Sequence, residues 1–417
     1  MTYLTCKMHR AALLAVALGV PLPVHAGTTD PTGYIAHTIP AGTQRMIGVS
    51  LHALKGFTSN VEAVTATGLT LKDTVSADLF SESDSGYLNI RVGAYAGMTT
   101  TVTSFSGKDL TLTRSMAGLV SPGDQVEVIA NHTIGGLFGA ANSVGLLPGE
   151  NASEADTIGV WNSQTQSSRV FYFRTGEGWR ESGNEAAGDQ AGMTIPFPAA
   201  LVINRRGTTP LQVTVPGVVP MPLDQRYFEV FPGRNLISAP FSKEGTIADY
   251  GLYDEGSPFS VTGGASAPDA DTIRFSNLST ATDSEVIYYR LGQGWRTAGA
   301  DGDAGDTAIE IGQSMDFQRR GPAGFIKARG IPQSPSGAAL AVQAAPLPTV
   351  SITRTLPAAG GVQLEWNAEA GATYQVQTQL SGENTWKNLG DPVVAQAATG
   401  STVCRPSGQG FLRIVQH

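Results

Sequence analysis

The chain has 417 residues, which is long enough for two or three domains. It contains 50 Gly and 24 Pro, and only 15% of its residues are charged, a composition that suits short β-strands joined by tight turns. Its net charge is −8, and no basic cluster exceeds two adjacent arginines, so nucleic acid and anionic lipid are excluded as favoured partners.

The N-terminus has the layout of a signal peptide. Lys7 and Arg10 precede an apolar run at 11–20 that is too short to span a bilayer, and small residues follow it up to Ala26. We expect cleavage after Ala26, which leaves 25 basic and 35 acidic residues and a net charge of −10. The sequence therefore predicts a secreted or cell-surface protein without a membrane span, with the periplasm as the alternative. Cys404 is then its only cysteine, so no intrachain disulfide is expected.

The first third of the chain predicts short strands. Residues 27–44 are rich in Gly, Thr and Pro and are predicted to be irregular, and Arg45–Leu51 is a first apolar strand. From 57 to 129 the sequence alternates between short strands and turns, which predicts a small barrel or meander. A helical turn is expected at Ile134–Phe138 and another at Thr246–Tyr250.

One hairpin sequence occurs twice. Val170–Arg180 contains Tyr-Phe-Arg-Thr-Gly-Glu-Gly-Trp-Arg, and Val286–Arg296 repeats this pattern 116 residues later. Four further landmarks recur in the same order, between 113 and 115 residues apart: Thr133-Ile134 with Thr246-Ile247, Ala155–Ile158 with Ala270–Ile273, Asn204–Gly207 with Gln318–Gly321, and Gly217 with Gly330. Such constant spacing indicates a duplicated folding unit.

The strand Asn235–Ala239 before the second copy corresponds to Arg45–Leu51. It leads almost directly to Thr246, whereas the first copy has the meander between the equivalent positions. We therefore predict an all-β fold of two homologous units and a C-terminal β-sandwich-like domain. The expected boundaries are 1–26 for the signal peptide, 27–222 for the first unit with an inserted module at about 57–129, 223–332 for the second unit, 333–348 for a linker and 349–417 for the C-terminal domain.

The C-terminal region resembles a fibronectin-III-like module. The resemblance lies in a strand ending on Trp366, a Gly-x-x-Tyr-x-Val strand around Tyr374, a Trp-x-x-Leu-Gly segment at Trp386, and a terminal strand at Phe411–Val415. Modules of this kind close many secreted bacterial proteins, and the resemblance implies a β-sandwich.

Residues 40 to 332 resemble an uncharacterised family of secreted β-repeat proteins of Verrucomicrobia. The shared motifs are the Thr133–Phe138 segment, the Tyr-x-x-Gly-x-Gly-Trp-Arg hairpin and the Arg-Arg-Gly strand end. This chain departs from that family by having more Ala and Gly in its loops. The resemblance implies an architecture and an exported location, and it brings no activity.

The paired hairpins are the main candidate for ligand binding. The rings of Trp179 and Trp295 could stack on sugars while Arg180 and Arg296 bond to sugar hydroxyls. The alternative, which we favour, is that these aromatic residues fill cross-strand pairs and the core.

A Ca²⁺ site is conceivable in the loop after the second hairpin. Asp301, Asp303 and Asp306 are spaced so that their carboxylates, helped by backbone carbonyls, could surround the ion. The simpler interpretation is a polar loop turned by Gly, because the terminal bidentate Glu of a standard site is missing. No other cofactor is expected.

The sequence favours a protein without catalytic activity. It contains no recognised nucleophile, zinc or phosphate-binding motif. His132 could serve as a base but is better explained by packing. Asp156 and Asp271 are equivalent in the two copies and precede Thr-Ile strands, which favours turn or cap hydrogen bonds. A glycosidase needs only two carboxylates, so a glycan-active hydrolase stays the weakest alternative.

We therefore predict an exported, non-catalytic structural or adhesive protein of the cell envelope or extracellular space. A carbohydrate-binding protein that uses the paired Trp-Arg hairpins is the second hypothesis. The expected partners are glycans or other envelope proteins, and strand edges offer a route to self-association. Exposed tryptophan rings along a groove would support sugar binding, whereas buried rings would support the structural role.

Overall fold

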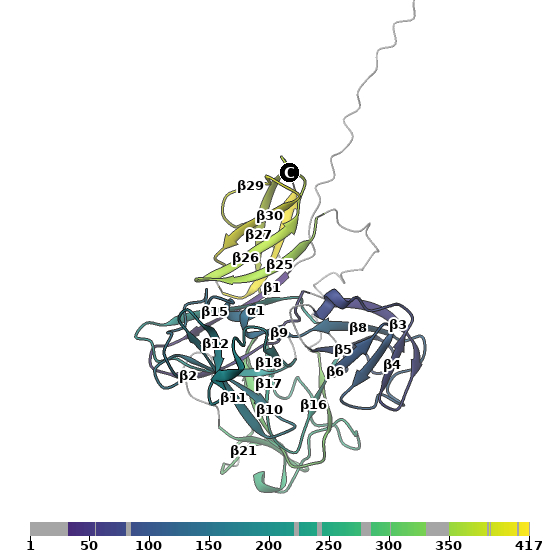
Figure 1. Cartoon of the computed structure of the whole chain (residues 1–417). Coiled ribbons are helices and arrows are strands. Elements are labelled where there is room, and N and C mark those ends of the chain that lie inside the picture. The colour runs from purple at the N-terminus through teal and green to yellow at the C-terminus, as the bar shows by residue number, and fades with distance from the viewer. Residues whose placement is uncertain are drawn as a thin grey trace, which may run out of the picture.

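A computed structural model describes residues 32–54, 56–80, 85–220, 225–239, 244–276, 285–300, 302–330, 350–381, 383, 385–406 and 408–416. The predicted signal peptide and linker lie outside these residues. Strands dominate the described chain, and its one α-helix is the five-residue α1 (Ile134–Phe138). The prediction of an all-β protein is therefore confirmed (Figure 1).

The first unit is built on a five-stranded antiparallel sheet. Its order is β12-β11-β10-β14-β2, with bounds Gly178–Glu181, Ser167–Arg174, Thr157–Asn162, Ala200–Asn204 and Gln44–Gly48. The inner face of this sheet buries a core that includes Ile158, Phe171, Trp179 and Leu201. β11 and β12 form the first Trp-Arg hairpin, in which Phe173 pairs with Trp179.

The second unit repeats this sheet strand for strand. Its order is β21-β20-β19-β23-β17, with bounds Gly294–Thr297, Ile287–Arg290, Thr272–Phe275, Ser314–Arg319 and Gly233–Ser238. Tyr289 pairs with Trp295 as Phe173 pairs with Trp179. The predicted correspondence between the strands before each copy is also present, because β17 and β2 occupy the same edge of their sheets.

One smaller strand pair recurs in each unit. β9 (His132–Thr133) pairs with β13 (Thr194–Ile195), as β18 (Gly245–Thr246) pairs with β22 (Ala308–Ile309). The first unit follows β9 with α1, whose N-terminus is capped by the Thr133 hydroxyl accepting the Gly136 N–H at 2.9 Å. At Thr246–Tyr250 the second unit forms only a turn, closed by the Tyr250 N–H donating to the Thr246 carbonyl.

A closed six-stranded barrel is inserted between β2 and β9. Its order is β3-β4-β7-β6-β5-β8, with bounds Gly56–Val64, Gly68–Leu71, Asp109–Leu112, Thr99–Ser106, Gly86–Val92 and Gln125–Ala130, and the 3₁₀ turn η1 (Ala77–Phe80) precedes β5. The barrel core includes Tyr227 and Phe325 from the second unit. The insertion in one unit is thus packed against the other.

The N-terminal segment differs from the prediction. Residues 32–39 are strand β1 and not irregular chain, because β1 lies between two partners. It pairs along its length with β15 (Leu211–Gly217), and its first three residues pair with β31 (Gly410–Gln416). Most of its residues are buried, so the polar–apolar alternation that marks a half-exposed strand is missing from the sequence. The second unit has a matching pair, β16 (Gln225–Val230) with β24 (Gly324–Arg329).

The C-terminal domain is a small β-sandwich that shares a sheet with the first unit. One layer is β25-β26-β30 (Ile352–Ala358, Gly361–Asn367, Thr399–Cys404). The other continues from β1 through β31 to β27 (Thr373–Leu380), which also pairs with β28 (Lys387–Asn388) and β29 (Val393–Val394). Trp366 and Tyr374 fill the space between the layers. Pairing between β1 and β31 therefore ties this domain to the units below it in Figure 1.

The two units meet through equivalent strand ends. The Gly48 N–H donates to the Gly312 carbonyl at 3.0 Å, and the Ser238 N–H donates to the Pro198 carbonyl at 2.8 Å. Gly48 and Ser238 end the equivalent strands β2 and β17, so the two hydrogen bonds are reciprocal. A side chain at Gly48 would meet the Gln313 carbonyl oxygen at 2.7 Å, which explains the glycine there.

Candidate functional site

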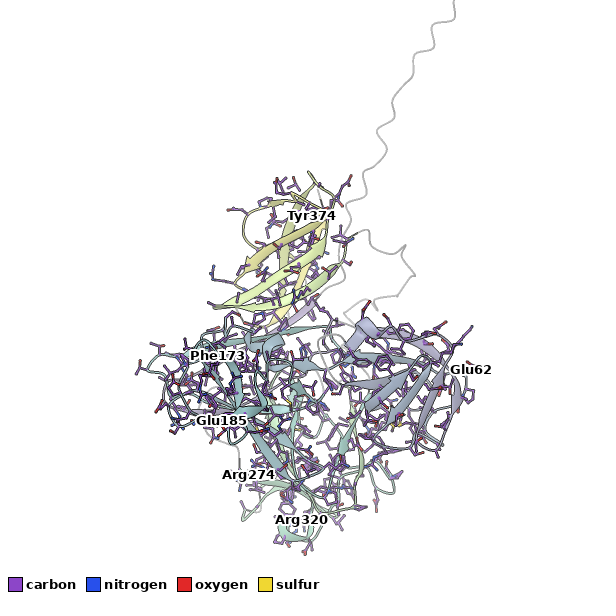
Figure 2. The ribbon with its side chains drawn as sticks, in the orientation of Figure 1. Glu62, Phe173, Glu185, Arg274, Arg320 and Tyr374 are labelled. Atoms are coloured by element: carbon purple, nitrogen blue, oxygen red, sulfur yellow. The ribbon has the colours of Figure 1, made fainter. Side chains whose placement is uncertain are left out.

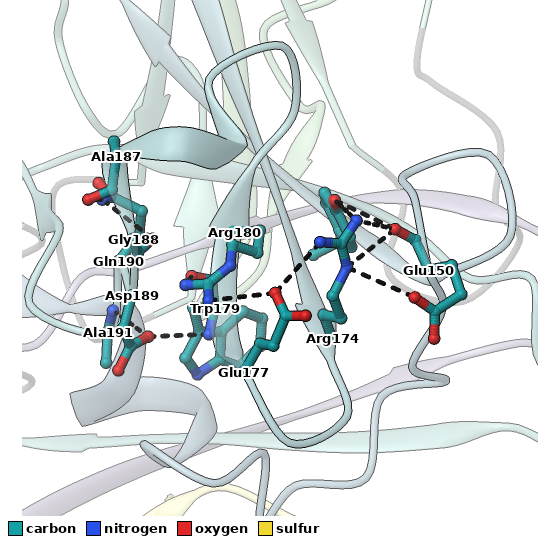
Figure 3. Close-up of polar contacts among 11 residues, drawn as sticks. Glu150, Arg174, Glu177, Trp179, Arg180, Ala187, Gly188, Asp189, Gln190 and Ala191 are labelled. Atoms are coloured by element: carbon teal, nitrogen blue, oxygen red, sulfur yellow. Dashed lines mark hydrogen bonds and ion pairs between the residues drawn. The ribbon is translucent and has the colours of Figure 1, made fainter.

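The rings of the two Trp-Arg hairpins are buried. Trp179 is 0% and Trp295 5% exposed. The Trp179 indole N–H donates to the Gly139 carbonyl at 2.9 Å, and its backbone N–H donates to the Asp189 carboxylate at 2.8 Å (Figure 3). Neither ring offers a face on which a sugar could stack, so the proposed stacking role of these tryptophans does not fit the structure.

The neighbouring arginines pair with acidic side chains of their own units. Arg180 lies 3.3 Å from Glu177, which also pairs with Arg174 (Figure 3). Arg296 lies 3.3 Å from Asp303. These contacts hold the hairpins in place, and they occupy the guanidinium groups that the sequence suggested for ligand binding.

Replacing Trp179 by Phe tests this structural role. The change removes the indole hydrogen bond to Gly139 and part of a buried ring, and we expect a loss of about 1–2 kcal/mol in the free energy of unfolding. Urea denaturation measures this loss. Because the ring is buried, glycan binding should not change in Trp179→Phe, and a variant that keeps its stability but loses a glycan would contradict this assignment.

The predicted Ca²⁺ loop is only partly described. Asp301 lies outside the described residues, and Asp306 is exposed. The Asp303 carboxylate faces Arg296 and accepts the Gly305 N–H at 2.9 Å. Among the described residues no three metal-ligating side chains gather. The Ca²⁺ site therefore stays a prediction, with one of its three ligands engaged by an arginine.

The equivalent Asp156 and Asp271 form a buried ion pair in each unit. Asp156 pairs with Arg205, and Asp271 pairs with Arg319 at 2.5 Å. Asp156 also accepts the backbone N–H groups of Leu147 (2.8 Å) and Arg206 (2.6 Å). In the second unit Asp271 accepts those of Thr262 (2.7 Å) and Arg320 (2.6 Å). Each carboxylate thus fastens the Arg-Arg-Gly strand end to a neighbouring loop, a structural role that leaves no oxygen free for chemistry.

A pocket that the sequence did not predict lies where the barrel and both units meet. We call it the junction pocket, and its volume is about 210 Å³. Its walls include Thr99, Thr100, Thr101 and Thr113 from the barrel, Asn131, Trp161, Asn162 and Gln164 from the first unit, and Glu229, Phe231 and Leu236 from the second. Hydroxyl and amide groups therefore line the pocket together with three aromatic rings, those of Trp161, Phe197 and Phe231, and with other apolar side chains.

Trp161 is held at the boundary between the two units. Its indole N–H donates to the Arg234 carbonyl at 2.8 Å, and the Arg234 guanidinium lies over its ring at 5.5 Å from the centroid. The side chain is half-buried, unlike the buried Trp179. Trp161 lies next to the end of β10, at the position that Ser276 occupies in the second unit, and this difference between the copies is the signal that sequence reasoning missed.

Glu229 supplies the carboxylate of the junction pocket. Burial raises the pKa of Glu229, and the Arg114 guanidinium at 2.6 Å acts in the opposite direction. Glu229 is the one acidic residue among the described lining residues. A glycosidase would place two carboxyl groups about 5–10 Å apart across its cleft. The described lining residues can therefore bind a polar ligand, but they do not include the second carboxyl group that a glycosidase needs.

The histidines of the described residues do not form a second centre. His37 and His52 are buried. Burial lowers the pKa of His132 to about 4, although the hydrogen bond between its ring Nε2 and the Leu51 carbonyl oxygen, at 3.0 Å, acts in the opposite direction.

No helix in the described chain is long and apolar enough to cross a bilayer. The sequence matches no protein-family model and no curated protein.

Proposed function

We propose that this chain is an exported, non-catalytic adhesive protein of the cell envelope or extracellular space, and that it holds glycans in the junction pocket. The observation that carries the proposal is the exposed part of Trp161 in a pocket whose walls combine hydroxyl and amide side chains with apolar ones. The site differs from the hairpins that the sequence suggested, while the class of ligand is the same.

The chemistry of the pocket suits a sugar ring. Sugars present apolar C–H faces, which pack on aromatic rings, and many hydroxyls, which both donate and accept hydrogen bonds. Thr101 and Gln164 can act in both directions, and Glu229 accepts. The volume of about 210 Å³ is enough for one sugar ring, below the roughly 300 Å³ at which pockets for larger ligands begin.

The walls of the pocket are positioned before any ligand arrives. The Asn131 side chain donates to the Ser85 hydroxyl at 2.9 Å and accepts the Phe197 N–H at 3.3 Å. Arg114 of the barrel pairs with Glu229 of the second unit. Preformed walls reduce the entropy lost on binding, which supports a binding role for this junction.

A purely structural role is the second candidate. It is supported by the burial of Trp179 and Trp295 and by the reciprocal hydrogen bonds between the units. A scaffold of this kind would need no glycan. The two candidate functions are distinguished by one measurement, which is whether residues 27–417 bind any glycan.

Replacing Trp161 by Ala tests the proposal. We expect roughly a tenfold loss of affinity, because the aromatic wall of the pocket is removed. A glycan array first identifies a ligand, and isothermal titration calorimetry then compares the variants. Gln164→Ala removes an exposed amide without disturbing packing and should weaken binding a few-fold.

Trp386→Ala is the matched control. Trp386 is also half-buried and lies under an arginine, with Arg413 at 4.3 Å from its ring centroid, but it belongs to the C-terminal domain. Its loss should leave the affinity unchanged. Equal affinities for Trp161→Ala, Gln164→Ala and the parent protein would place the site elsewhere, and a parent protein that binds no glycan would favour the structural role.

A further inference from the structure

We infer that the glycan is acidic, and that its carboxylate or sulfate groups are bound by Arg274 and Arg320 on the outer face of the second unit. The inference rests on the proposed function, because it assigns the ligand class and extends the junction pocket to a second hollow. In Figure 2 these two arginines lie on the same part of the molecule, in the second unit.

A hollow of about 380 Å³ lies on the outer face of the sheet formed by β17, β23 and β19. The 3₁₀ turn η3 (Ala267–Asp269) forms one of its borders. The polar side chains that line it are Arg234, Thr272, Arg274, Asp316, Gln318 and Arg320. Three guanidinium groups therefore face one depression together with an amide and a hydroxyl.

Two of these three arginines keep their charge available. Arg234 is engaged, because its Nε and terminal nitrogen both bond to the Asp316 carboxylate, at 3.0 and 2.8 Å. Arg274 and Arg320 are exposed and make no ion pair with any residue in the described part of the chain. The planar guanidinium group forms paired hydrogen bonds with carboxylate and sulfate oxygens, so two such groups along one hollow suit an anionic chain.

The first unit lacks this charged face. Thr272 pairs with Gln318 as Thr157 pairs with Asn204, which fixes the equivalent positions. In this register Arg274 corresponds to Gly159, Asp316 to Val202, Arg234 to Gln44 and Arg320 to Arg206. The buried Asp–Arg pairs and an exposed arginine at the strand end (Arg206 or Arg320) are shared by both units, whereas Arg274 and the Arg234–Asp316 pair belong to the second unit alone. A feature that the common fold does not need points to a role of its own.

Arg234 connects the hollow to the junction pocket. Its guanidinium lies over the Trp161 ring on the junction side and pairs with Asp316 on the hollow side. A polysaccharide with a sugar in the junction pocket can therefore continue over Arg234 towards Arg274 and Arg320. The predicted mature chain has a net charge of −10, so this is a local cationic surface on an acidic protein, which would concentrate anionic chains at this face.

Polygalacturonate, dextran sulfate and neutral dextran are suitable probes. We expect residues 27–417 to bind both acidic polymers more tightly than dextran, with an affinity that falls as salt is added. Arg274→Ala combined with Arg320→Ala should lower the affinity for the acidic polymers about tenfold. The Arg320 backbone N–H that bonds to Asp271 is retained in this variant, so folding is preserved.

Arg206→Ala is the matched control, because Arg206 is exposed at the equivalent strand end of the first unit. It should bind like the parent protein. Equal affinities for acidic and neutral polymers, with no effect of the double variant, would overturn this inference and leave the proposed function intact if Trp161→Ala still weakens binding. Binding to phosphatidylglycerol vesicles in place of the polymers would overturn the glycan assignment. Binding to none of the three polymers would overturn this inference, and the proposed function would fall with it only if the glycan array also finds no ligand.

Discussion

Replacing Asp156 by Asn is expected to lower the free energy of unfolding by about 3–5 kcal/mol. The carboxylate is fully buried and its partner Arg205 is nearly so, which means that the change leaves a buried guanidinium without its counter-charge. The remaining described partners of Arg205 belong to Thr209, a neutral residue. Urea denaturation followed by tryptophan fluorescence measures the loss.

The duplicated fold supplies two internal comparisons. Asp271→Asn removes the same charge from the second unit and should cost a similar amount, because its pair with Arg319 is equally buried. Asp316→Asn breaks a more exposed pair with Arg234 and should cost less than about 1 kcal/mol. A loss below about 1 kcal/mol for Asp156→Asn would mean that the buried pair is not what stabilises the Arg-Arg-Gly strand end.

Acidification from pH 7 to 5 is expected to destabilise the folded protein strongly. Burial lowers the pKa of His37 to about 4, and burial together with the nearby Arg226 lowers the pKa of His52 well below its ordinary value. The unfolded chain takes up protons near pH 6.5 and the folded chain does not, so stability is lost as pH falls below 6.5 and the loss is complete below about 4. At pH 5, protonation of His37 in the unfolded chain should have lowered the free energy of unfolding by roughly 2 kcal/mol relative to pH 7.

Urea denaturation at several pH values between 7 and 5 tests this expectation, because most carboxylates stay ionised in that range. In His37→Leu the free energy of unfolding should fall by roughly 2 kcal/mol less between pH 7 and pH 5 than it does in the parent protein. Repacking around the introduced leucine changes the stability equally at each pH, so it does not affect this difference. A free energy of unfolding that is the same at pH 7 and pH 5 would show that these histidines are not held neutral by burial.

Much of the fold could be predicted because the duplication leaves marks at constant spacing. The Asp-Thr-Ile and Arg-Arg-Gly motifs recur because each unit needs its buried ion pair, and the hairpin recurs because Trp179 and Trp295 fill equivalent cores. The sequence from about 57 to 129 has no counterpart in the second copy, which indicated the inserted barrel. Local pattern and repetition agree in these regions.

Strand β1 escaped prediction for a physical reason. Its neighbours β15 and β31 lie roughly 180 and 380 residues further along the chain, so nothing near residues 32–39 signals that they are covered on both edges. Alternation of polar and apolar residues identifies a half-exposed strand well, but it is absent from a strand that is buried on both faces. Residues 32–39 therefore form a strand because of their pairing with β15 and β31, which are distant in the sequence.

The candidate site could not be predicted for a related reason. The exposure of a tryptophan depends on distant chain: Gly139 covers Trp179, whereas Trp161 borders an open pocket. Likewise Arg274 and Arg320 come to line one hollow only when β19 and β23 pair. Comparing the two copies for their differences, rather than their identities, would have pointed to both Trp161 and Arg274.

The reciprocal hydrogen bonds between the units also bear on how such a chain can diversify. Gly48 bonding to Gly312, and Ser238 bonding to Pro198, is the arrangement that a twofold-symmetric dimer of identical single units would have. In a homodimer every substitution appears on both subunits at once. Joining the halves in one polypeptide lifts that constraint, so one half can carry a barrel while the other carries an arginine face, and the symmetric contact between them is kept.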